Sequence, residues 1–271
     1  MKKILSLIMA AAMCLSFAGC GEKKADNADT QNQAQTEASD LAEIKDKGKM
    51  VIGITDYAPM DYKDDNGEWI GFDAEFAKAA CEKLGVEPEF IEIDWDNKAL
   101  ELDAKSIDCV WNGMTLTNEV EKAMECSQPY VKNAQVVVMA ADKVADYKDA
   151  ESMKELKFVA EAGSAGEGAI KDTGLDKNYT AVTAQTDALM EVSSGSADAC
   201  VIDITMANAM TGEGTSFANL KSGLELTTEE YVIGFRKGSD AAAEINKIMD
   251  ELKADGTLEK LAEKYELTLA E

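Results

Sequence analysis

SIDCVWN at residues 106–112 is the stretch that decides the fold, and SADACVID at residues 196–203 is a weak echo of it. Each stretch follows an amphipathic segment, reads as a short buried strand, and ends on a polar residue, Asn112 or Asp203. Ligands of open α/β sheets bind beyond the carboxyl ends of the strands. Two such strand ends that face each other therefore predict a cleft between two lobes.

Outward from these two strands, short apolar strands alternate with amphipathic helices along most of the chain. In the helix expected at 72–84, apolar residues share one face and acidic residues occupy the first turn. Strands are expected at 50–54, 90–93, 107–111, 135–140, 157–160, 179–182, 199–202 and 230–235, and further helices from 164 and at 185–192, 240–254 and 258–265. This alternation predicts an α/β fold of mostly parallel sheets that are covered on both faces.

The N-terminus reads as an export signal over residues 1–19. Lys2 and Lys3 give a charged start, and the apolar run after them is short for a membrane span but suits a signal peptide. The run ends in Ala-Gly before Cys20, which resembles a bacterial lipoprotein cleavage box. We therefore expect a lipid on Cys20; the alternative is a plain secretory signal followed by an incidental cysteine.

Residues 20–40 carry the expected lipid at Cys20 and then a tether without any aromatic or large aliphatic residue. Such a segment cannot bury enough apolar surface to offset the entropy of ordering it, so we expect it to be disordered. Two or more acyl chains on the cysteine would anchor the protein stably. The expected location is extracytoplasmic, with a lipid anchor in the cell membrane.

Composition argues against several kinds of function. The net charge of −25 disfavours nucleic acid and anionic lipid headgroups as partners. The sequence contains no histidine, so we expect no zinc site, no histidine-activated nucleophile, no catalytic residue and no cofactor. An even number of cysteines beyond the signal region permits two disulfides, whereas their apolar neighbours favour buried thiols. These cysteines are Cys81, Cys109, Cys126 and Cys200.

Four motifs in a fixed order carry a resemblance to a known family. They are GFDAEFA at 71–77, GMTLT at 113–117, SQPY at 127–130 and ADGTLEKL at 254–261. At this spacing the chain resembles the extracellular amino-acid-binding proteins of the family-3 solute-binding class, over about residues 45–267. The resemblance implies a two-lobe periplasmic-binding-protein fold of type II with two hinge strands. Its lobes would comprise 41–136 with the returning 231–271, and 137–230.

The resemblance also implies a function. The protein would capture a polar amino acid by closing its lobes around it, and would deliver the ligand, as a monomer, to the permease of an ABC importer. One alternative is a receptor for a non-α-amino-acid amine or another small polar solute. Others are a sensory module that presents its ligand to a membrane receptor, and an enzyme similar to the cyclohexadienyl dehydratases. A site without histidine is poorly equipped for the last, so we expect no enzyme.

In the first lobe the resemblance assigns five ligand contacts. Tyr57 matches an aromatic residue that covers the ligand, and Trp95 matches a second apolar wall, with ordinary core packing as the alternative for both. Asn112, Gly113 and Thr115 match the loop that receives an ammonium on a carbonyl and a carboxylate on a hydroxyl and N–H groups. The neighbouring tryptophan at position 111 either faces this loop or ends a buried strand.

In the second lobe, Ser164 and Ala165 open a helix whose free N–H groups form a natural seat for a carboxylate, unless this is a plain glycine turn. By resemblance, Glu161 occupies a ligand-contact position that is often apolar, so it would select a polar or cationic side chain. Asp203 matches the acid that pairs with the α-ammonium of the ligand. A charged residue at the end of an apolar strand is costly without a partner, which supports this role.

One position departs from the family pattern. Where the family carries an arginine that clamps the α-carboxylate, this chain has Val120, and its one arginine, Arg236, lies on the last strand. Either the carboxylate is held by N–H groups, Thr115 and a lysine, or the ligand has no such carboxylate. Lys98 is the candidate lysine, with a solvated surface residue as the alternative.

Overall fold

The computed structural model describes residues 39–271, which belong to one unit of the chain. The expected signal peptide, Cys20 and all but the last two residues of the expected tether lie outside the described residues. Asp40 begins the first helix, α1 (Asp40–Lys47), and the Ser39 hydroxyl caps it by accepting from the Ala42 N–H at 3.0 Å. Within residues 39–271, no helix combines the length and the apolar character that a membrane span needs.

The first sheet has the strand order β4-β1-β5-β13-β6, with β7 also paired to β13. Strands β4 and β5 run parallel to β1, whereas β13 is antiparallel to β5, β6 and β7. The strands are β1 (Lys49–Ile54), β4 (Glu87–Glu92), β5 (Cys109–Thr115), β6 (Met124–Cys126), β7 (Val131–Asn133) and β13 (Glu229–Arg236). A separate hairpin joins β2 (Tyr62–Lys63) to β3 (Trp69–Ile70).

Helices cover this sheet because their apolar faces must be buried against it. They are α2 (Phe72–Leu84), η1 (Trp95–Asn97), α3 (Lys98–Asp103), α4 (Asn118–Ala123), α9 (Ala241–Ala254) and α10 (Thr257–Lys264). The ring of Phe76 meets that of Trp111 edge-on at 4.7 Å, and Trp111 is fully buried. Of the two interpretations of Trp111, the structure supports the buried core residue, but it lies within β5 (Cys109–Thr115) and not at the end of that strand.

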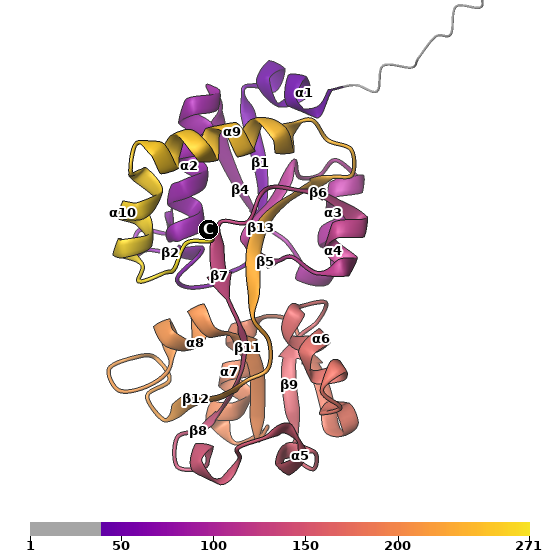
Figure 1. The fold of residues 1–271 in the computed structure, drawn as a ribbon, viewed down its shortest axis with the longest axis vertical. Coiled ribbons are helices and arrows are strands. Elements are labelled where there is room, and N and C mark those ends of the chain that lie inside the picture. Colours follow the sequence, from indigo (N-terminus) through magenta and orange to yellow (C-terminus); the bar gives the residue numbers. More distant parts are fainter. Residues whose placement is uncertain (1–38) are drawn as a thin grey trace, which may run out of the picture. The chain divides into compact units, whose positions relative to one another are not determined.

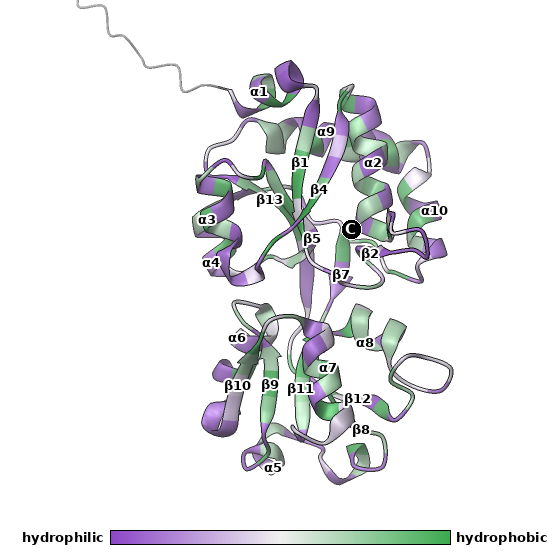
Figure 2. Ribbon diagram, turned by 180° about the vertical axis from the view of Figure 1, so that it is seen from behind, coloured by the Kyte–Doolittle hydropathy of each residue, from purple (hydrophilic) through white to green (hydrophobic). Residues whose placement is uncertain are grey.

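The second sheet has the order β10-β9-β11-β8-β12. Its strands are β8 (Gln135–Ala140), β9 (Phe158–Glu161), β10 (Tyr179–Val182), β11 (Ala199–Asp203) and β12 (Leu220–Glu225). Its helices are η2 (Val144–Asp146), α5 (Ala150–Met153), α6 (Ala165–Asp172), η3 (Asp176–Asn178), α7 (Gln185–Ser194) and α8 (Ile204–Met210). The strands β8, β9 and β11 are strongly hydrophobic (Figure 2), as expected for a sheet buried on both faces.

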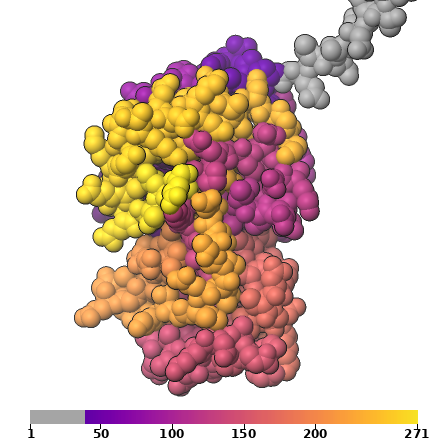
Figure 3. All heavy atoms as spheres, in the orientation of Figure 1, coloured from indigo at the N-terminus to yellow at the C-terminus, as the bar shows by residue number. Residues whose placement is uncertain are grey.

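The chain crosses between the two sheets twice, from β7 to β8 and from β12 to β13 (Figure 1). The two crossings are joined where the Leu226 N–H donates to the Gln135 carbonyl at 2.8 Å. Beyond the second crossing, the yellow C-terminal segment packs back on the first lobe beside the indigo segment (Figures 1 and 3). The predicted lobe limits, at 136/137 and 230/231, fall within β8 and β13 and remain predictions.

The predicted two-lobe α/β fold is confirmed, with a refinement of strand direction. Each sheet contains three parallel strands, β4-β1-β5 in the first and β10-β9-β11 in the second. The other pairs are antiparallel, because β8 and β13 enter the sheets from the crossings in the opposite direction.

The cysteines of the described chain are free thiols. Cys81, Cys109 and Cys200 are buried, and Cys126 is half-buried. The chain's one arginine is also structural. Arg236 pairs with Asp40 at 3.0 Å and donates to the carbonyls of Leu102 and Ile107 at 3.1 and 2.8 Å.

Candidate functional site

A small cavity of about 20 Å³ lies where β5 and the η1 segment of the first lobe meet β9, α6 and β11 of the second. Nine of the ten predicted ligand contacts line it, and Lys98 does not. The nine are Tyr57, Trp95, Asn112, Gly113, Thr115, Glu161, Ser164, Ala165 and Asp203. Thr55 and Gln185 also line it and were missed by the sequence reasoning. We call this space the small pocket.

Thr55 fixes the orientation of Asn112. The Asn112 Oδ1 accepts from the Thr55 N–H at 3.0 Å and from its hydroxyl at 2.7 Å. The Asn112 amide nitrogen donates to the Thr55 carbonyl at 3.0 Å and to Asp61 at 2.7 Å. The side chain of Asn112 is therefore fully engaged by the protein.

Gly113 is required by close packing. Its φ is +55°, and a Cβ atom there would lie 2.6 Å from the ring of Tyr57. Its N–H donates to the carboxyl of Asp73 at 2.6 Å, and the Tyr130 hydroxyl donates to the same oxygen at 2.8 Å. This N–H is therefore committed to the protein, which the resemblance did not anticipate.

Two buried acids, Asp61 and Asp73, thus accept hydrogen bonds from Asn112 and Gly113 of β5. Burial raises the pKa of Asp73 to about 7, and burial together with the charge of Asp73 raises the pKa of Asp61 well above its usual range. The second carboxyl oxygen of each is buried without a hydrogen-bond partner among residues 39–271. Protonated forms are favoured because two ionised carboxylates cannot share a dry site cheaply.

Tyr57 links the two lobes directly. Its hydroxyl is 2.6 Å from the hydroxyl of Thr205 on α8 and 2.5 Å from that of Tyr231 on β13. Tyr231 in turn donates to Asp203 at 2.9 Å. This chain of hydroxyls connects the first-lobe aromatic wall with the acid at the end of β11.

Asp203 is held by four donors. One carboxylate oxygen accepts from Tyr231 and Gln135, both at 2.9 Å, and from Asn133. The other accepts from Gln185 at 2.6 Å, and Gln185 also accepts the Asp203 N–H at 3.0 Å. Burial is the main cause that raises the pKa of Asp203, to about 7. Gln185 therefore positions the carboxylate that the sequence singled out.

Glu161 provides a second carboxyl group in the same small pocket. It is 3% exposed, and its Oε1 has no hydrogen-bond partner among the described residues. Burial, reinforced by the charge of Asp203 and opposed by Lys98, raises the pKa of Glu161 to about 8. An unpartnered buried carboxyl oxygen in a pocket favours a cationic ligand group.

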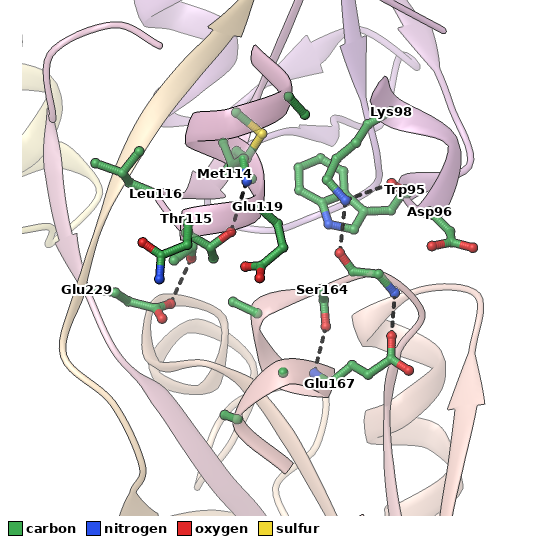
Figure 4. A pocket seen from close by; sticks show the side chains of 18 of the residues that line it. Trp95, Asp96, Lys98, Met114, Thr115, Leu116, Glu119, Ser164, Glu167 and Glu229 are labelled. Atoms are coloured by element: carbon green, nitrogen blue, oxygen red, sulfur yellow. Dashed lines mark hydrogen bonds between the residues drawn. The ribbon is translucent and has the colours of Figure 1, made fainter. Parts of the chain in front are cut away.

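Lys98 lies beside the small pocket, in a larger cavity of about 620 Å³ (Figure 4). Its ammonium sits over the ring of Trp95, 4.8 Å from the centroid, and donates to the carbonyls of Trp95 and Gly163 at 3.1 and 2.9 Å. Lys98 thus ties the first lobe to the start of α6. Two of its three donors are used there, which leaves one for a ligand.

The donors expected to hold a ligand carboxylate are partly taken by the protein's own acids (Figure 4). The hydroxyl of Thr115 donates to Glu229 at 2.7 Å, and the N–H of Gly163 donates to Glu167 at 2.7 Å. Ser164 caps α6 by accepting from the Glu167 N–H at 3.2 Å. The N–H groups of Ala165 and Gly166 remain without a partner within residues 39–271.

Comparison with known proteins agrees with this architecture. The arginine-binding extracellular protein ArtP of Bacillus subtilis is 28% identical over 275 residues, covering 98% of each chain. The L-cystine-binding protein TcyJ of Escherichia coli is 27% identical over 232 residues, covering 83% of this chain and 85% of the relative.

A solved structure shows the same fold. The ABC uptake transporter substrate-binding protein from Streptococcus pneumoniae with bound histidine superposes with a TM-score of 0.77. It is 26% identical, and the match covers 85% of this chain and 97% of that one. The family model matches residues 50–268. The chain therefore belongs to the bacterial extracellular solute-binding proteins, family 3.

Proposed function

We propose that this protein is the receptor of an ABC importer for a cationic amino acid of the arginine, lysine and ornithine class. The observation that carries the proposal is the pair of carboxyl groups, Glu161 and Asp203, in one small pocket whose described walls contain no lysine or arginine. The unpartnered oxygen of Glu161 requires a donor, and a cationic side chain supplies one.

Each charged group of such a ligand has a partner in the site. The α-ammonium pairs with Asp203, and the cationic side chain pairs with Glu161 against the aromatic walls of Tyr57 and Trp95. The carboxylate lies at the N-terminus of α6, where the N–H of Ala165 and its neighbour are free. This assignment needs no arginine at position 120.

Binding requires the lobes to open, because about 20 Å³ holds no more than a water molecule. Opening about the crossings would break direct bonds between the lobes, among them those from Lys98 to Gly163 and from Tyr57 to Thr205. A ligand that touches both lobes adds its own contacts to these bonds and so stabilises the closed form. The lobes in this proposal are 41–136 with 231–271, and 137–230.

Related proteins support the ligand class. ArtP is named for arginine, and the pneumococcal receptor holds histidine. Since the cystine-binding relative shows that the family also takes other amino acids, the choice of a cation rests on Glu161 and not on relatives alone.

Delivery places the receptor outside the cytoplasm. We propose that Cys20 carries the lipid, that the anchored receptor acts as a monomer, and that it hands its ligand to a membrane permease. Cys20→Ser should move the protein from the membrane fraction to the medium or the soluble extracytoplasmic fraction. Retention of this variant in membranes would contradict the anchor.

The ligand class is tested by thermal unfolding of the full-length protein with matched compounds. At a hundred times its Kd a ligand adds roughly 2.7 kcal/mol of stability. We expect a clear shift with L-arginine, L-lysine or L-ornithine, and little with L-citrulline, which replaces the guanidinium of arginine by a neutral group. Agmatine, which lacks the carboxylate, tests the alternative of a non-α-amino-acid amine. Shifts with neutral or acidic amino acids alone would reject the proposal.

A further inference from the structure

The 620 Å³ cavity adjoins the small pocket, and the function proposed above uses only that part of its lining which the two spaces share. The two spaces share four lining residues: Trp95, Thr115, Ser164 and Ala165. Both lobes contribute to its walls, and it is lined by α4 on one side and by α6 on the other (Figure 4). A ligand seated in the small pocket could therefore continue past Thr115 and Ser164 into this cavity.

One part of the first-lobe wall of the cavity is apolar. Met114, Val120 and Met124 are buried there, with exposures of 1%, 8% and 2%, and Ala123 lies between them. These side chains carry no hydrogen-bonding group apart from the weakly accepting sulfurs. The wall suits a methylene stem better than a polar group.

The charged side chains that line the rest of the cavity are mostly acidic. Five acids line the cavity, Asp96, Glu119, Glu167, Asp172 and Glu229, against two lysines. Lys171 pairs with Glu167 at 2.6 Å, whereas Lys98 donates to two neutral carbonyls and keeps its positive charge, so the acids still outnumber the lysines. The carboxylate of Glu119 has no ion pair within the described chain and points from α4 toward Ser164 (Figure 4).

We infer that the ligand is a cationic amino acid with an extended side chain, in which an apolar stem leads to a second cationic group inside the 620 Å³ cavity. The inference rests on the proposed function, because Glu161 and Asp203 hold the first part of that ligand. The buried, unpartnered oxygen of Glu161 anchors the nearer cation, and the carboxylates around Glu119 attract the farther one. Val120 is smaller than the arginine that the family pattern has at this position, so it leaves room for the apolar stem of the ligand side chain.

The test uses calorimetric titration of the full-length protein with three probes that share a lysine head. These are L-lysine, Nε-(4-aminobutyl)-L-lysine, and Nε-pentyl-L-lysine, in which a methyl group replaces the terminal ammonium. We expect the aminobutyl probe to bind about tenfold more tightly than the pentyl probe, because several partly exposed carboxylates each add a modest attraction. Raising the salt from about 50 mM to about 500 mM should remove most of this preference.

Variants then locate the second cation. Glu119→Gln should lower the preference for the aminobutyl probe from about tenfold to about threefold, since one carboxylate among several is lost. Glu121→Gln is the matched control, because Glu121 is exposed on the same helix and does not line the cavity. Leu116→Trp, at an exposed position of the cavity wall, should weaken both long probes relative to L-lysine.

The outcomes separate the inference from the function beneath it. If L-lysine binds and both long probes bind at least about a hundredfold more weakly, the cavity takes no ligand and the inference is overturned while the proposed function stands. The inference also fails if the two long probes bind equally at low salt. If no probe binds and L-arginine fails as well, the proposed function is rejected and the inference with it.

Discussion

The hydroxyl of Thr115 on β5 donates a hydrogen bond of 2.7 Å to the carboxylate of Glu229 at the start of β13. The same oxygen of Glu229 accepts from the side-chain amides of Asn133 and Gln135, each at 2.6 Å. A carboxylate of the protein thus takes the hydroxyl that the family resemblance assigns to a ligand carboxylate. It also ties β5 to both crossings between the lobes.

Replacing Glu229 by Gln should weaken this junction. A glutamine can offer only its neutral carbonyl oxygen to the donors of Thr115, Asn133 and Gln135, so these bonds lose the charge of their acceptor, and we expect the free energy of unfolding to fall by about 1–3 kcal/mol. Chemical denaturation measures this change. Glu230→Gln, one residue further along β13, is the control and should cost less than about 0.5 kcal/mol. Equal stability of the two variants would mean that the junction contributes nothing.

The same variant has a second readout at Asp203. The charge of Glu229 is one cause that raises the pKa of Asp203, after burial. Glu229→Gln should therefore move the pH midpoint of cationic-ligand binding downward, because Asp203 ionises more readily. A midpoint that moves upward would contradict this electrostatic coupling.

Arg236→Gln should affect stability but not ligand binding. The guanidinium pairs with Asp40, and both side chains are only slightly exposed, at 12% and 11%. Removing it leaves Asp40 with only the more distant Lys105, at 3.7 Å, and takes one donor from each of the two carbonyls, so we expect a loss of about 2–4 kcal/mol. The affinity for L-arginine should stay within about twofold, since this residue lies outside both cavities. A large loss of affinity in a folded variant would show that the chain's one arginine serves the ligand.

The stability of the unliganded protein should fall as the pH rises through the range of the buried acids. In the folded chain the pKa of Glu161 is raised to about 8 and that of Asp203 to about 7. Between the ordinary carboxyl pKa and these values the folded chain binds more protons than the unfolded chain, so unfolding becomes easier as the pH rises. Melting curves should therefore show a higher Tm near about pH 6 than near about pH 8.5.

Ligand affinity should change in the opposite direction over the same range. A cation binds an ionised carboxylate better than a protonated one, so the affinity for L-arginine should rise as Glu161 and Asp203 ionise. Glu161→Gln should reduce both the affinity and the size of this rise. Affinity that is constant from about pH 6 to about pH 8.5 would show that neither group contacts the cation.

Some site residues are marked by a pattern in the neighbouring sequence, whereas others are recognised only by contacts with residues far away in the chain. Asp203 ends β11, and Asn112 directly follows an apolar run inside β5 (Cys109–Thr115), so a single stretch of sequence points to each of them. Gln185 and Glu229 act through contacts with residues 18 and 114 positions away, and no local pattern encodes such a partner. Trp111 could not be assigned because an aromatic residue at the expected end of a strand suits both a core and a pocket, and the strand in fact continues to Thr115.

Strand direction was equally hard to read. The apolar runs of β8 and β13 correctly predict that these strands are buried. Burial alone does not show whether a strand runs parallel or antiparallel to its neighbours. Both strands follow a crossing between the lobes, and this connection makes them antiparallel to their neighbours. The small pocket depends on this arrangement, since the crossings bring Gln135 and Tyr231 to Asp203.

Val120→Arg tests how the ligand carboxylate is held. Val120 is buried on α4 and lines the large cavity together with Thr115, Ser164 and Ala165. A guanidinium at this position could reach a carboxylate seated at the start of α6 and bind it through two parallel hydrogen bonds. We expect the affinity for a neutral amino acid such as L-glutamine to rise by about tenfold or more.

The same substitution should remove the preference for a second cation, because the new charge repels a cationic group in the cavity. Val120→Leu is the control, since it adds volume without charge and should leave the affinity for L-glutamine nearly unchanged. Calorimetry with L-glutamine and the two long lysine probes measures both effects in one series. If Val120→Arg folds and binds L-glutamine no better than the wild type, the carboxylate lies elsewhere and the pocket has been rebuilt around the valine.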